Sequence, residues 1–387
     1  MRPVTTFIRH KGIVGVLAAS RLIHRITGGK RPRFLFMLSE KTEDIGSSVR
    51  IVEEDETSVT VAKFRPDGSI DDGEWKIMTA TDLHLDPGGE ELNNKSIRMI
   101  IRQIKKHKPD IFIFTGDVIE SDCQQIDCVQ LSLLMERLGV YWAYTFGNHE
   151  AREEKGYFKY LMYKGLQYYP HCLCRFGKEE LHGYGNFAIH IKNGENSLAK
   201  SLFLFDSGRD IQEKTKKEYS LPADMNGYDF IKPTQTAWYL SELEKVRRRY
   251  EITGKTVTYM HIPVPEYKNV FDGNEKDGFT PSAKAQLIYG TQYESVASSP
   301  YNSGFFDAAV SDGALQAMFS GHDHVNDFCA LYKGVYLVYT QCSGYNTYNM
   351  TEKAGWDEKD CHYGVTLTTL VPDGTLKIEQ CKNYPLL

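Results

Sequence analysis

Residues 317–328 read AMFSGHDHVNDF, an apolar run that stops at Gly321 and is followed by His322 and His324. The apolar run is typical of a buried strand, so both imidazoles would stand where that strand ends. In open α/β sheets, ligands bind at the carboxyl ends of strands, where loops from distant parts of the chain meet. Because residues i and i+2 of an extended segment point to the same face, we expect the two histidines to face one crevice.

The same arrangement recurs from Trp75 onward, where short β-like runs end in polar residues and alternate with helical stretches. This pattern is typical of a layered α/β domain. We predict strands within WKIMTATDLHL (75–85), DIFIFTGDVI (110–119), VYWAYTFGNHE (140–150), KSLFLFDSG (200–208), KTVTYMHIPV (255–264), AMFSGHDH (317–324) and GVYLVYTQCSG (334–344).

Two stretches between these runs have the periodicity of amphipathic helices that cover a sheet. SIRMIIRQIKKHK (96–108) places Ile97, Ile100, Ile101 and Ile104 on one face and lysines on the other. PTQTAWYLSELEKVRRRY (233–250) has one stripe made of Tyr239, Leu240, Leu243, Val246 and Tyr250. Thr234 is the residue that we expect to cap the start of this second helix.

Potential metal ligands, or neighbours of ligands, follow most of the predicted strands: Asp82, His84, Asp117, Asn148, His149, His261, His322 and His324. A single histidine is commonly a hydrogen-bonded core residue, but two close pairs with further strand-end ligands predict a metal site. So many ligands exceed the need of one ion, so we expect two ions that share a bridging carboxylate. Paired metal ions clamp displacements at phosphorus, and the predicted chemistry is therefore phosphoester hydrolysis.

Five motifs resemble, in type and order, those of the calcineurin-like metallophosphoesterase superfamily. They are TDLH (81–84), GD (116–117), GNHE (147–150), the single histidine His261 after a strand, and GHDH (321–324). The resemblance covers roughly residues 75–345. It implies an α/β fold, α+β in some schemes, with a four-layer β-sandwich flanked by helices and an N-terminal accessory segment. It also implies a bridging hydroxide as the nucleophile and two divalent metal ions as cofactors, either Mn²⁺, Fe²⁺ or Zn²⁺.

Roles for individual residues follow from the same resemblance. One ion would be held by Asp82, His84 and His324, the other by Asn148, His261 and His322, and Asp117 would bridge the two. His149 would lie just outside the metals and donate a proton to the leaving oxygen, or stabilise its charge. The alternative is a loop histidine that only helps to hold the GNHE turn. Glu150 is expected to accept backbone amides in that turn.

Glu120, three residues after Asp117, distinguishes this chain from two branches of the superfamily. Purple acid phosphatases resemble it but have a tyrosine there, whose phenolate binds ferric iron, and a glycine in place of His84. We therefore predict a related branch that lacks the tyrosine ligand and gives a colourless protein. Protein Ser/Thr phosphatases have an acidic residue at this offset that pairs with the GNHE histidine, which predicts a Glu120–His149 pair. They follow it with Arg-Gly, whereas Ser121-Asp122 stands here, which disfavours a protein phosphatase.

Residues 1–74 are predicted to be a basic N-terminal arm followed by a β-hairpin, and residues 75–387 the catalytic domain. Met1 to Ser39 hold eight Lys/Arg and no acidic residue. This arm could be a secretory signal around residues 12–20, an amphipathic helix that contacts a membrane surface or a partner, or a segment packed on the main domain. We expect the last. Residues 48–64 alternate apolar and polar side chains around an acidic turn, as a hairpin does.

The composition, with 41% hydrophobic and 25% charged residues, is typical of a soluble globular enzyme. A net charge of -5 predicts no binding to nucleic acid, and no apolar run is long enough for a transmembrane segment. Eight cysteines without a CxxC pair indicate reduced thiols. We expect a cytoplasmic phosphoesterase, with export as the alternative, acting on a phosphorylated small molecule or nucleotide, as a monoester or a diester. The other function to weigh is a catalytically silent binding or scaffold protein of the same fold, which the intact motifs disfavour.

Overall fold

The computed structural model describes residues 42–382, apart from positions 87, 122–123, 152–156, 253 and 358–360. The basic arm over residues 1–39 lies outside the described residues, so its three interpretations stay open. Within the described part of the chain, every helix is too short or too polar to span a bilayer.

The smaller of two large sheets has the strand order β17-β16-β3-β4-β5. Its strands are β3 (Trp75–Ala80), β4 (Ile111–Thr115), β5 (Tyr141–Thr145), β16 (Gly364–Leu370) and β17 (Leu376–Lys382). All residues of β4 and β5 are buried, as expected for parallel strands covered on both faces. Because β3, β4 and β5 are parallel, their carboxyl ends open at the same edge.

The larger sheet has the order β1-β2-β6-β7-β9-β13-β15-β14-β12, and β8 pairs with β7. Its strands are β1 (Val49–Glu54), β2 (Ser58–Lys63), β6 (Phe187–Lys192), β7 (Ser197–Leu204), β8 (Glu251–Ile252), β9 (Thr256–Tyr259), β12 (Gln286–Tyr289), β13 (Leu315–Ser320), β14 (Cys329–Tyr332) and β15 (Val335–Tyr339). At its centre β7, β9, β13 and β15 run parallel, so these strands also end at one edge. A separate hairpin joins β10 (Phe271–Asn274) to β11 (Gly278–Pro281).

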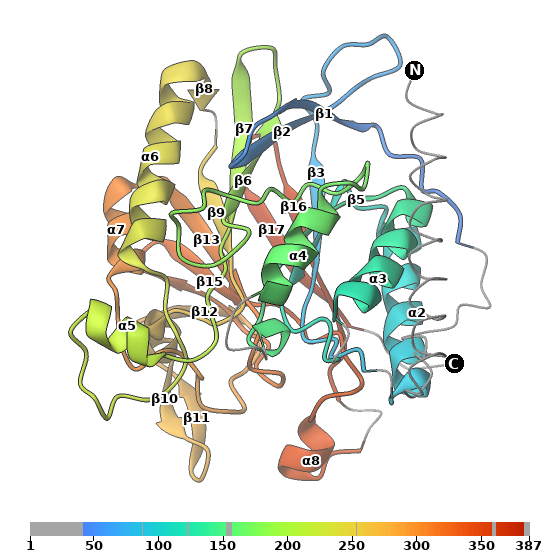
Figure 1. Ribbon diagram of the computed structural model, residues 1–387. Helices are drawn as coiled ribbons and strands as arrows, with labels where there is room; N and C mark the ends of the chain where they lie inside the picture. Colours follow the sequence, from blue (N-terminus) through green and yellow to red (C-terminus); the bar gives the residue numbers. More distant parts are fainter. Residues whose placement is uncertain are drawn as a thin grey trace.

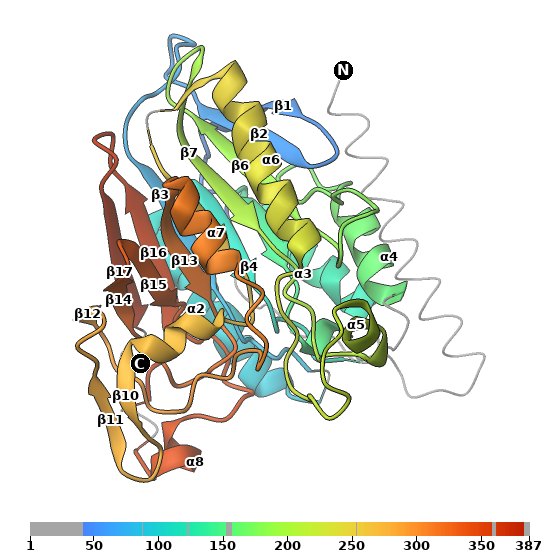
Figure 2. The same cartoon turned by 90° about the vertical axis from the view of Figure 1, so that its left-hand side faces the viewer.

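Figure 1 shows the two sheets between two groups of helices. On one side lie α2 (Glu90–His107), α3 (Gln124–Leu138) and α4 (Tyr157–Leu166), and on the other lie α6 (Pro233–Arg249) and α7 (Phe305–Asp312). Figure 2 presents the α6 and α7 side to the viewer. Short elements complete the chain: α5 (Glu213–Glu218), α8 (Met350–Ala354) and the 3-10 turns η1 (His149–Ala151) and η2 (Pro265–Asn269).

The buried core explains why the layers stack in this order. Side chains of both sheets, such as Phe114, Leu204 and Phe319, belong to one apolar cluster. A second cluster joins α6 and α7 to the outer face of the larger sheet, with Tyr239 packing against Phe203 at 4.7 Å between ring centroids. Each sheet is therefore covered on both faces, which confirms the predicted four-layer sandwich.

All seven predicted strands are present, as β3, β4, β5, β7, β9, β13 and β15, and both predicted helices are present as α2 and α6. The predicted cap of α6 is wrong: the helix begins at Pro233 with Lys232 as its N-cap residue. Proline suits the first helical position because its fixed backbone angle is already helical. The Lys232 N–H donates instead to Oε1 of Gln235, at 2.7 Å.

The predicted hairpin is confirmed, since β1 and β2 pair in antiparallel fashion. β2 also pairs with β6, so the hairpin extends the larger sheet. The division of the chain between residues 74 and 75 stays a prediction. The cysteines that the structure describes are free thiols: Cys128, Cys172, Cys174, Cys329, Cys342, Cys361 and Cys381.

Candidate metal centre

Five strands end at one edge of the sandwich, and each delivers polar side chains there. The loop after β3 contributes Asp82 and His84, the loop after β4 contributes Asp117 and Glu120, the loop after β5 contributes Asn148 and His149, His261 follows β9, and His322 and His324 follow β13. Short distances between their side chains, given below, show that the structure brings all nine predicted site residues together.

The backbone at four of these positions is not extended. Asp82, His84, Asp117 and His322 have φ values of 54°, 45°, 49° and 79°, in the left-handed region that side chains other than glycine seldom adopt. The expectation that i and i+2 residues of an extended segment share a face is therefore wrong for these pairs. Their side chains converge because tight turns follow the strands, and strained turns of this kind cluster at functional sites.

His261, Asp117, Asn148 and His322 form one group of candidate ligands. Nε2 of His261 lies 3.0 Å from Oδ2 of Asp117, 3.1 Å from Oδ1 of Asn148 and 3.3 Å from Nδ1 of His322. Nδ1 of His261 lies 2.9 Å from the carbonyl oxygen of Thr115, which can only accept a hydrogen bond. The ring proton therefore belongs on Nδ1, and the Nε2 lone pair faces the group, as in a metal-binding histidine.

A second group consists of Asp82, His84 and His324, all buried. Oδ1 of Asp82 lies 3.4 Å from Nε2 of His324 and 3.9 Å from Nε2 of His84. Nε2 of His84 is also 3.8 Å from Oδ2 of Asp117, the oxygen that contacts His261 in the first group. Oδ2 of Asp117 therefore lies between the two groups.

The charges of these groups interact strongly in the absence of metal. Burial would raise the pKa of Asp82 and Asp117, but His261 and the neighbouring imidazoles outweigh it and hold both pKa values below the usual range. Burial would lower the pKa of His261, but Asp117 and Asp82 raise it to about 9. Burial and the adjacent His261 lower the pKa of His322 to about 3. The carboxylates of Asp82 and Asp117 therefore favour a positive charge between the two groups of ligands.

Two buried polar atoms at the centre fit metal ions as partners. Oδ1 of Asp82 and Nε2 of His84 are buried and have no hydrogen-bond partner among the described residues. Leaving such atoms unpaired costs free energy, so groups of them are seldom found without a ligand. Carboxylate oxygen and imidazole nitrogen are suitable ligands for Mn²⁺, Fe²⁺ and Zn²⁺ alike, so the donor set fits a divalent pair without selecting the metal.

Glu150 fastens the loops that carry the ligands. Its carboxylate accepts hydrogen bonds from the backbone N–H of Asp117, Val118, Ile119 and Gly147 at 3.0, 2.6, 3.1 and 2.7 Å, and from the Tyr144 hydroxyl at 2.6 Å. Glu150 is fully buried. The expected structural role of this residue in the GNHE turn is therefore confirmed, and it also holds the loop after β4.

Two glycines permit the close approach of the loops. Gly116 has φ +88°, and a methyl group there would lie 2.6 Å from Nδ1 of His261. A methyl group at Gly321 would lie 2.7 Å from Oδ2 of Asp82. That oxygen instead accepts hydrogen bonds from the Thr81 hydroxyl at 2.8 Å and from the His322 N–H at 3.0 Å. The glycines of GD and GHDH therefore have a steric reason, because any side chain at these two positions would collide with the facing loop.

His149 and Glu120 lie at the exposed side of the centre. The His149 N–H donates to Oδ1 of Asp117 at 2.8 Å, and its ring is 33% exposed, whereas the candidate ligand histidines are buried. Oε1 of Glu120 lies 3.2 Å from Nδ1 of His149, as predicted, and Oε2 lies 2.7 Å from Nδ1 of His84, which was not predicted. Burial lowers the pKa of His149. This carboxylate thus orients two imidazoles of the centre.

Three further residues contact the centre without having been predicted. The ring of Tyr228 lies edge-on against His322, with centroids 4.2 Å apart, and Tyr348 stacks on His324 at the same separation. The hydroxyl of Thr347 forms a short hydrogen bond with Nδ1 of His324. Thr347 and Tyr348 lie beyond the stretch that carries the motifs, and tyrosines in loops have no distinctive spacing, so the sequence held no signal for them.

Two facing sheets flanked by helices, with aspartate, asparagine and histidine side chains gathered where their strands end, are characteristic of the metallophosphoesterase fold. A family model described as "Calcineurin-like phosphoesterase" matches residues 76–326, and the chain belongs to this family. The match spans every predicted site residue. It confirms the resemblance that the motifs indicated.

Curated relatives include proteins with phosphatase names. "Probable inactive purple acid phosphatase 14" of Arabidopsis thaliana is 30% identical over 322 residues, which cover 74% of this chain and 73% of that protein. "Phosphatase DCR2" of Saccharomyces cerevisiae is 27% identical over 282 residues, 67% of this chain and 45% of the relative. A solved dimetal phosphatase from Danio rerio has a TM-score of 0.47 and 12% identity, with coverage of 80% of this chain and 96% of that chain.

Proposed function

We propose that this chain is a two-metal phosphoesterase. Asp82, His84 and His324 would hold one divalent ion, Asn148, His261 and His322 the other, and Asp117 would bridge them. The observation that carries the proposal is the position of Oδ2 of Asp117, 3.0 Å from His261 of one group and 3.8 Å from His84 of the other. When bound, the two ions would supply Lewis-acid stabilisation of the phosphoryl oxygens and an activated water as the nucleophile.

His149 is the residue that we propose to protonate the leaving oxygen. Its Nδ1 lies 3.2 Å from Glu120, so this carboxylate orients the ring, and the burial that lowers the pKa of His149 makes its imidazolium a stronger acid. Nε2 is then the nitrogen that faces the centre, 3.9 Å from Oδ2 of Asp117. The partial exposure of the ring leaves room for substrate on this side of the ligands. Glu120 acts in this proposal through His149 and His84 rather than on the substrate.

The alternative is a catalytically silent binding or scaffold protein. It is favoured by the name of the Arabidopsis relative, which includes "probable inactive". Against it, no candidate ligand is missing from this chain, and His149 and Glu120 lie together at the rim. The buried, unpartnered Oδ1 of Asp82 and Nε2 of His84 support bound metal, which the enzyme requires.

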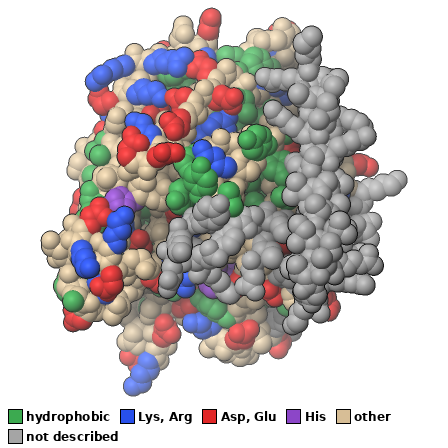
Figure 3. All heavy atoms as spheres, viewed as in Figure 1, with side chains coloured by type: hydrophobic (Ala, Val, Ile, Leu, Met, Phe, Trp, Pro, Cys, Tyr) green, Lys and Arg blue, Asp and Glu red, His purple; other side chains and the backbone are tan. Residues whose placement is uncertain are grey.

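Substrate, metals and location follow as parts of the same proposal. A phosphorylated small molecule or nucleotide, as a monoester or a diester, is the substrate class that we propose, with Mn²⁺, Fe²⁺ or Zn²⁺ at the centre. Figure 3 shows acidic and basic side chains interspersed over the described part of one face. The net charge of -5 is the reason that we propose no nucleic-acid partner. The free buried thiols support a reducing compartment such as the cytoplasm.

Hydrolysis of p-nitrophenyl phosphate and of bis(p-nitrophenyl) phosphate tests the proposal. The full chain, loaded in turn with Mn²⁺, Fe²⁺ and Zn²⁺, should release p-nitrophenol from at least one ester, and the ratio of the two rates gives the monoester or diester preference. Asp117→Asn should abolish the activity, because a neutral amide is a poor bridge between cations. Metal-loaded protein that hydrolyses neither ester would establish the silent alternative.

A further inference from the structure

A cavity of about 700 Å³ lies at the opposite end of the sandwich from the metal centre. It is lined by residues at the amino ends of β9 and β13, such as Thr256 and Gln316, whereas His261 and His322 follow the carboxyl ends. At about 3.3 Å per residue, the chain from Thr256 to His261 spans ~17 Å. A small molecule in this cavity could not reach the metal ligands, so the cavity is separate from the centre.

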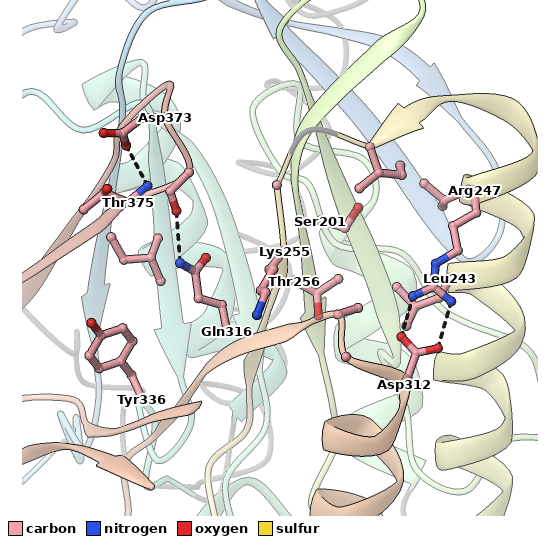
Figure 4. A pocket seen from close by; sticks show the side chains of 17 residues that line it. Ser201, Leu243, Arg247, Lys255, Thr256, Asp312, Gln316, Tyr336, Asp373 and Thr375 are labelled. Carbon is pink, nitrogen blue, oxygen red and sulfur yellow. Dashed lines mark hydrogen bonds and ion pairs between the residues drawn. The ribbon is translucent and has the colours of Figure 1, made fainter. Parts of the chain in front are cut away.

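The walls come from three parts of the fold, as Figure 4 shows. Leu243, Val246 and Arg247 of α6 line one side, and the turn between β16 and β17 lines the other. Arg247 and Asp312 of the wall compensate each other in a two-pronged ion pair, at 2.5 and 2.8 Å. The carboxylate of Asp373 accepts the N–H of Thr375 at 2.8 Å and keeps its negative charge.

Two lysines outnumber the one wall carboxylate outside an ion pair, Asp373, and give the cavity a net positive charge. Lys255 is exposed and lines the cavity, and Figure 4 shows its amine between Gln316 and Thr256. Lys200 lies just behind the wall, only 2% exposed, and donates to Oε1 of Gln316 at 2.6 Å. Among the described residues neither ammonium is paired with a carboxylate. Burial, and then the charge of Lys255, lower the pKa of Lys200 to about 8.

A buried ammonium with a neutral amide partner is an unusual arrangement, because buried lysines are almost always paired with an anion. The volume lies within the range of small-molecule sites, which combine apolar walls with a few placed charges. We propose that this cavity binds a small organic anion. Its phosphate or carboxylate group would contact Lys255 in the field of Lys200, and its apolar body would pack between α6 and Tyr336 or Leu376.

Calorimetric titration of the full chain with benzoate, phenylphosphonate and neutral benzamide tests the proposal. Benzoate or phenylphosphonate should bind at millimolar concentrations or below, and benzamide at least about tenfold more weakly, since a charge-assisted contact contributes about 1.5–3 kcal/mol. The two anions together distinguish a carboxylate from a phosphorus head group. Equal binding of benzoate and benzamide, or no binding of any probe, would overturn the proposal.

Three variants locate the binding. Lys255→Glu alters an exposed side chain, leaves the fold intact, and should weaken anion binding by about tenfold or more. Lys333→Glu, which changes an exposed lysine paired with Asp307 elsewhere, is the matched control and should leave the affinity unchanged. His322→Ala removes a candidate metal ligand and should also leave it unchanged. Binding that survives Lys255→Glu, or that disappears in His322→Ala, would overturn the assignment to this cavity.

Discussion

Oε2 of Glu120 lies 2.7 Å from Nδ1 of His84, so a carboxylate from the loop after β4 fixes the ring of a candidate ligand from the loop after β3. A proton held on Nδ1 by this contact leaves the Nε2 lone pair to face Asp82 and Asp117. Carboxylate partners of this kind raise the basicity of a metal-binding histidine. The same carboxylate reaches His149, so one side chain connects metal binding with proton donation.

The first prediction concerns this carboxylate. Glu120→Gln should lower the affinity for metal by about 10- to 100-fold, because the amide supports the His84 ring more weakly. Metal titration of chelator-treated protein, followed by mass spectrometry of bound metal, measures the change. The matched control is Glu136→Gln, which alters a similar carboxylate–imidazole pair with His171, 2.8 Å apart, outside the centre. Equal metal affinity in the two variants would contradict a role for Glu120.

His149→Ala should separate chemistry from metal binding. If His149 protonates the leaving oxygen, its loss should lower kcat by about 100- to 10,000-fold while two metal ions per chain remain. The effect should be smaller for p-nitrophenyl esters, whose leaving group needs less protonation, than for alkyl phosphates. His182→Ala, which changes another partly exposed histidine with an acidic neighbour, serves as the control. Loss of metal in His149→Ala would show that the residue is a ligand instead.

Iron-loaded protein should be colourless. The position that a tyrosine occupies in purple acid phosphatases holds Glu120, and its carboxylate is engaged by two histidines. Visible absorption spectra of the Fe³⁺-loaded chain should therefore lack a tyrosinate-to-iron band. Tyr228 is the tyrosine whose ring contacts His322, so the spectrum of Tyr228→Phe is the comparison. A band that is present in the parent chain and lost in Tyr228→Phe would assign that phenolate as a ligand.

The fourth prediction concerns the stability of the loops. Glu150→Ala should lower the free energy of unfolding by about 3–5 kcal/mol, because it removes a buried acceptor of five hydrogen bonds and leaves their donors unpaired. Urea unfolding at neutral pH measures the loss. Glu244→Ala removes an exposed partner of Arg248 on α6 and should cost less than about 0.5 kcal/mol. Similar values for the two variants would contradict the assigned role of Glu150.

Features of this centre can be predicted from the sequence when their signal lies within a short stretch of residues, and not when it depends on contacts between distant loops. TDLH, GD, GNHE, His261 and GHDH are local signals at strand ends, and parallel strands bring such ends together, so eight of the nine site residues could be found without coordinates. Glu120 was expected only from the resemblance to known phosphatases. The Glu120–His84 contact and the ring of Tyr228 depend on the paths of loops, which no spacing encodes. The left-handed backbone at Asp82 and His322 was missed because strand reasoning assumes extended residues. The Lys200–Gln316 pair joins residues 116 positions apart and has no local signature either.

The last prediction is that Lys200 makes the free energy of unfolding of this chain depend on pH. A lysine whose folded-state pKa is about 8 rather than 10.5 binds its proton less tightly in the folded chain than in the unfolded chain. Below about pH 8 both states are charged and folding bears the whole cost, about 3 kcal/mol at 1.36 kcal/mol per pKa unit. As pH rises from about 8 to 10.5, the folded lysine loses its proton first, so the cost fades and relative stability rises.

Lys200→Met keeps an unbranched side chain one atom shorter and removes the charge. The variant should be more stable than the parent chain at pH 7, and the difference should shrink between about pH 8 and 10.5. Urea unfolding of both chains across this range measures it, with Lys333→Met as the exposed control whose difference should stay near zero. Saturating benzoate should narrow the gap at pH 7 as well, because an anion in the cavity stabilises the buried ammonium. A gap that depends on neither pH nor benzoate would show that Gln316 alone satisfies Lys200.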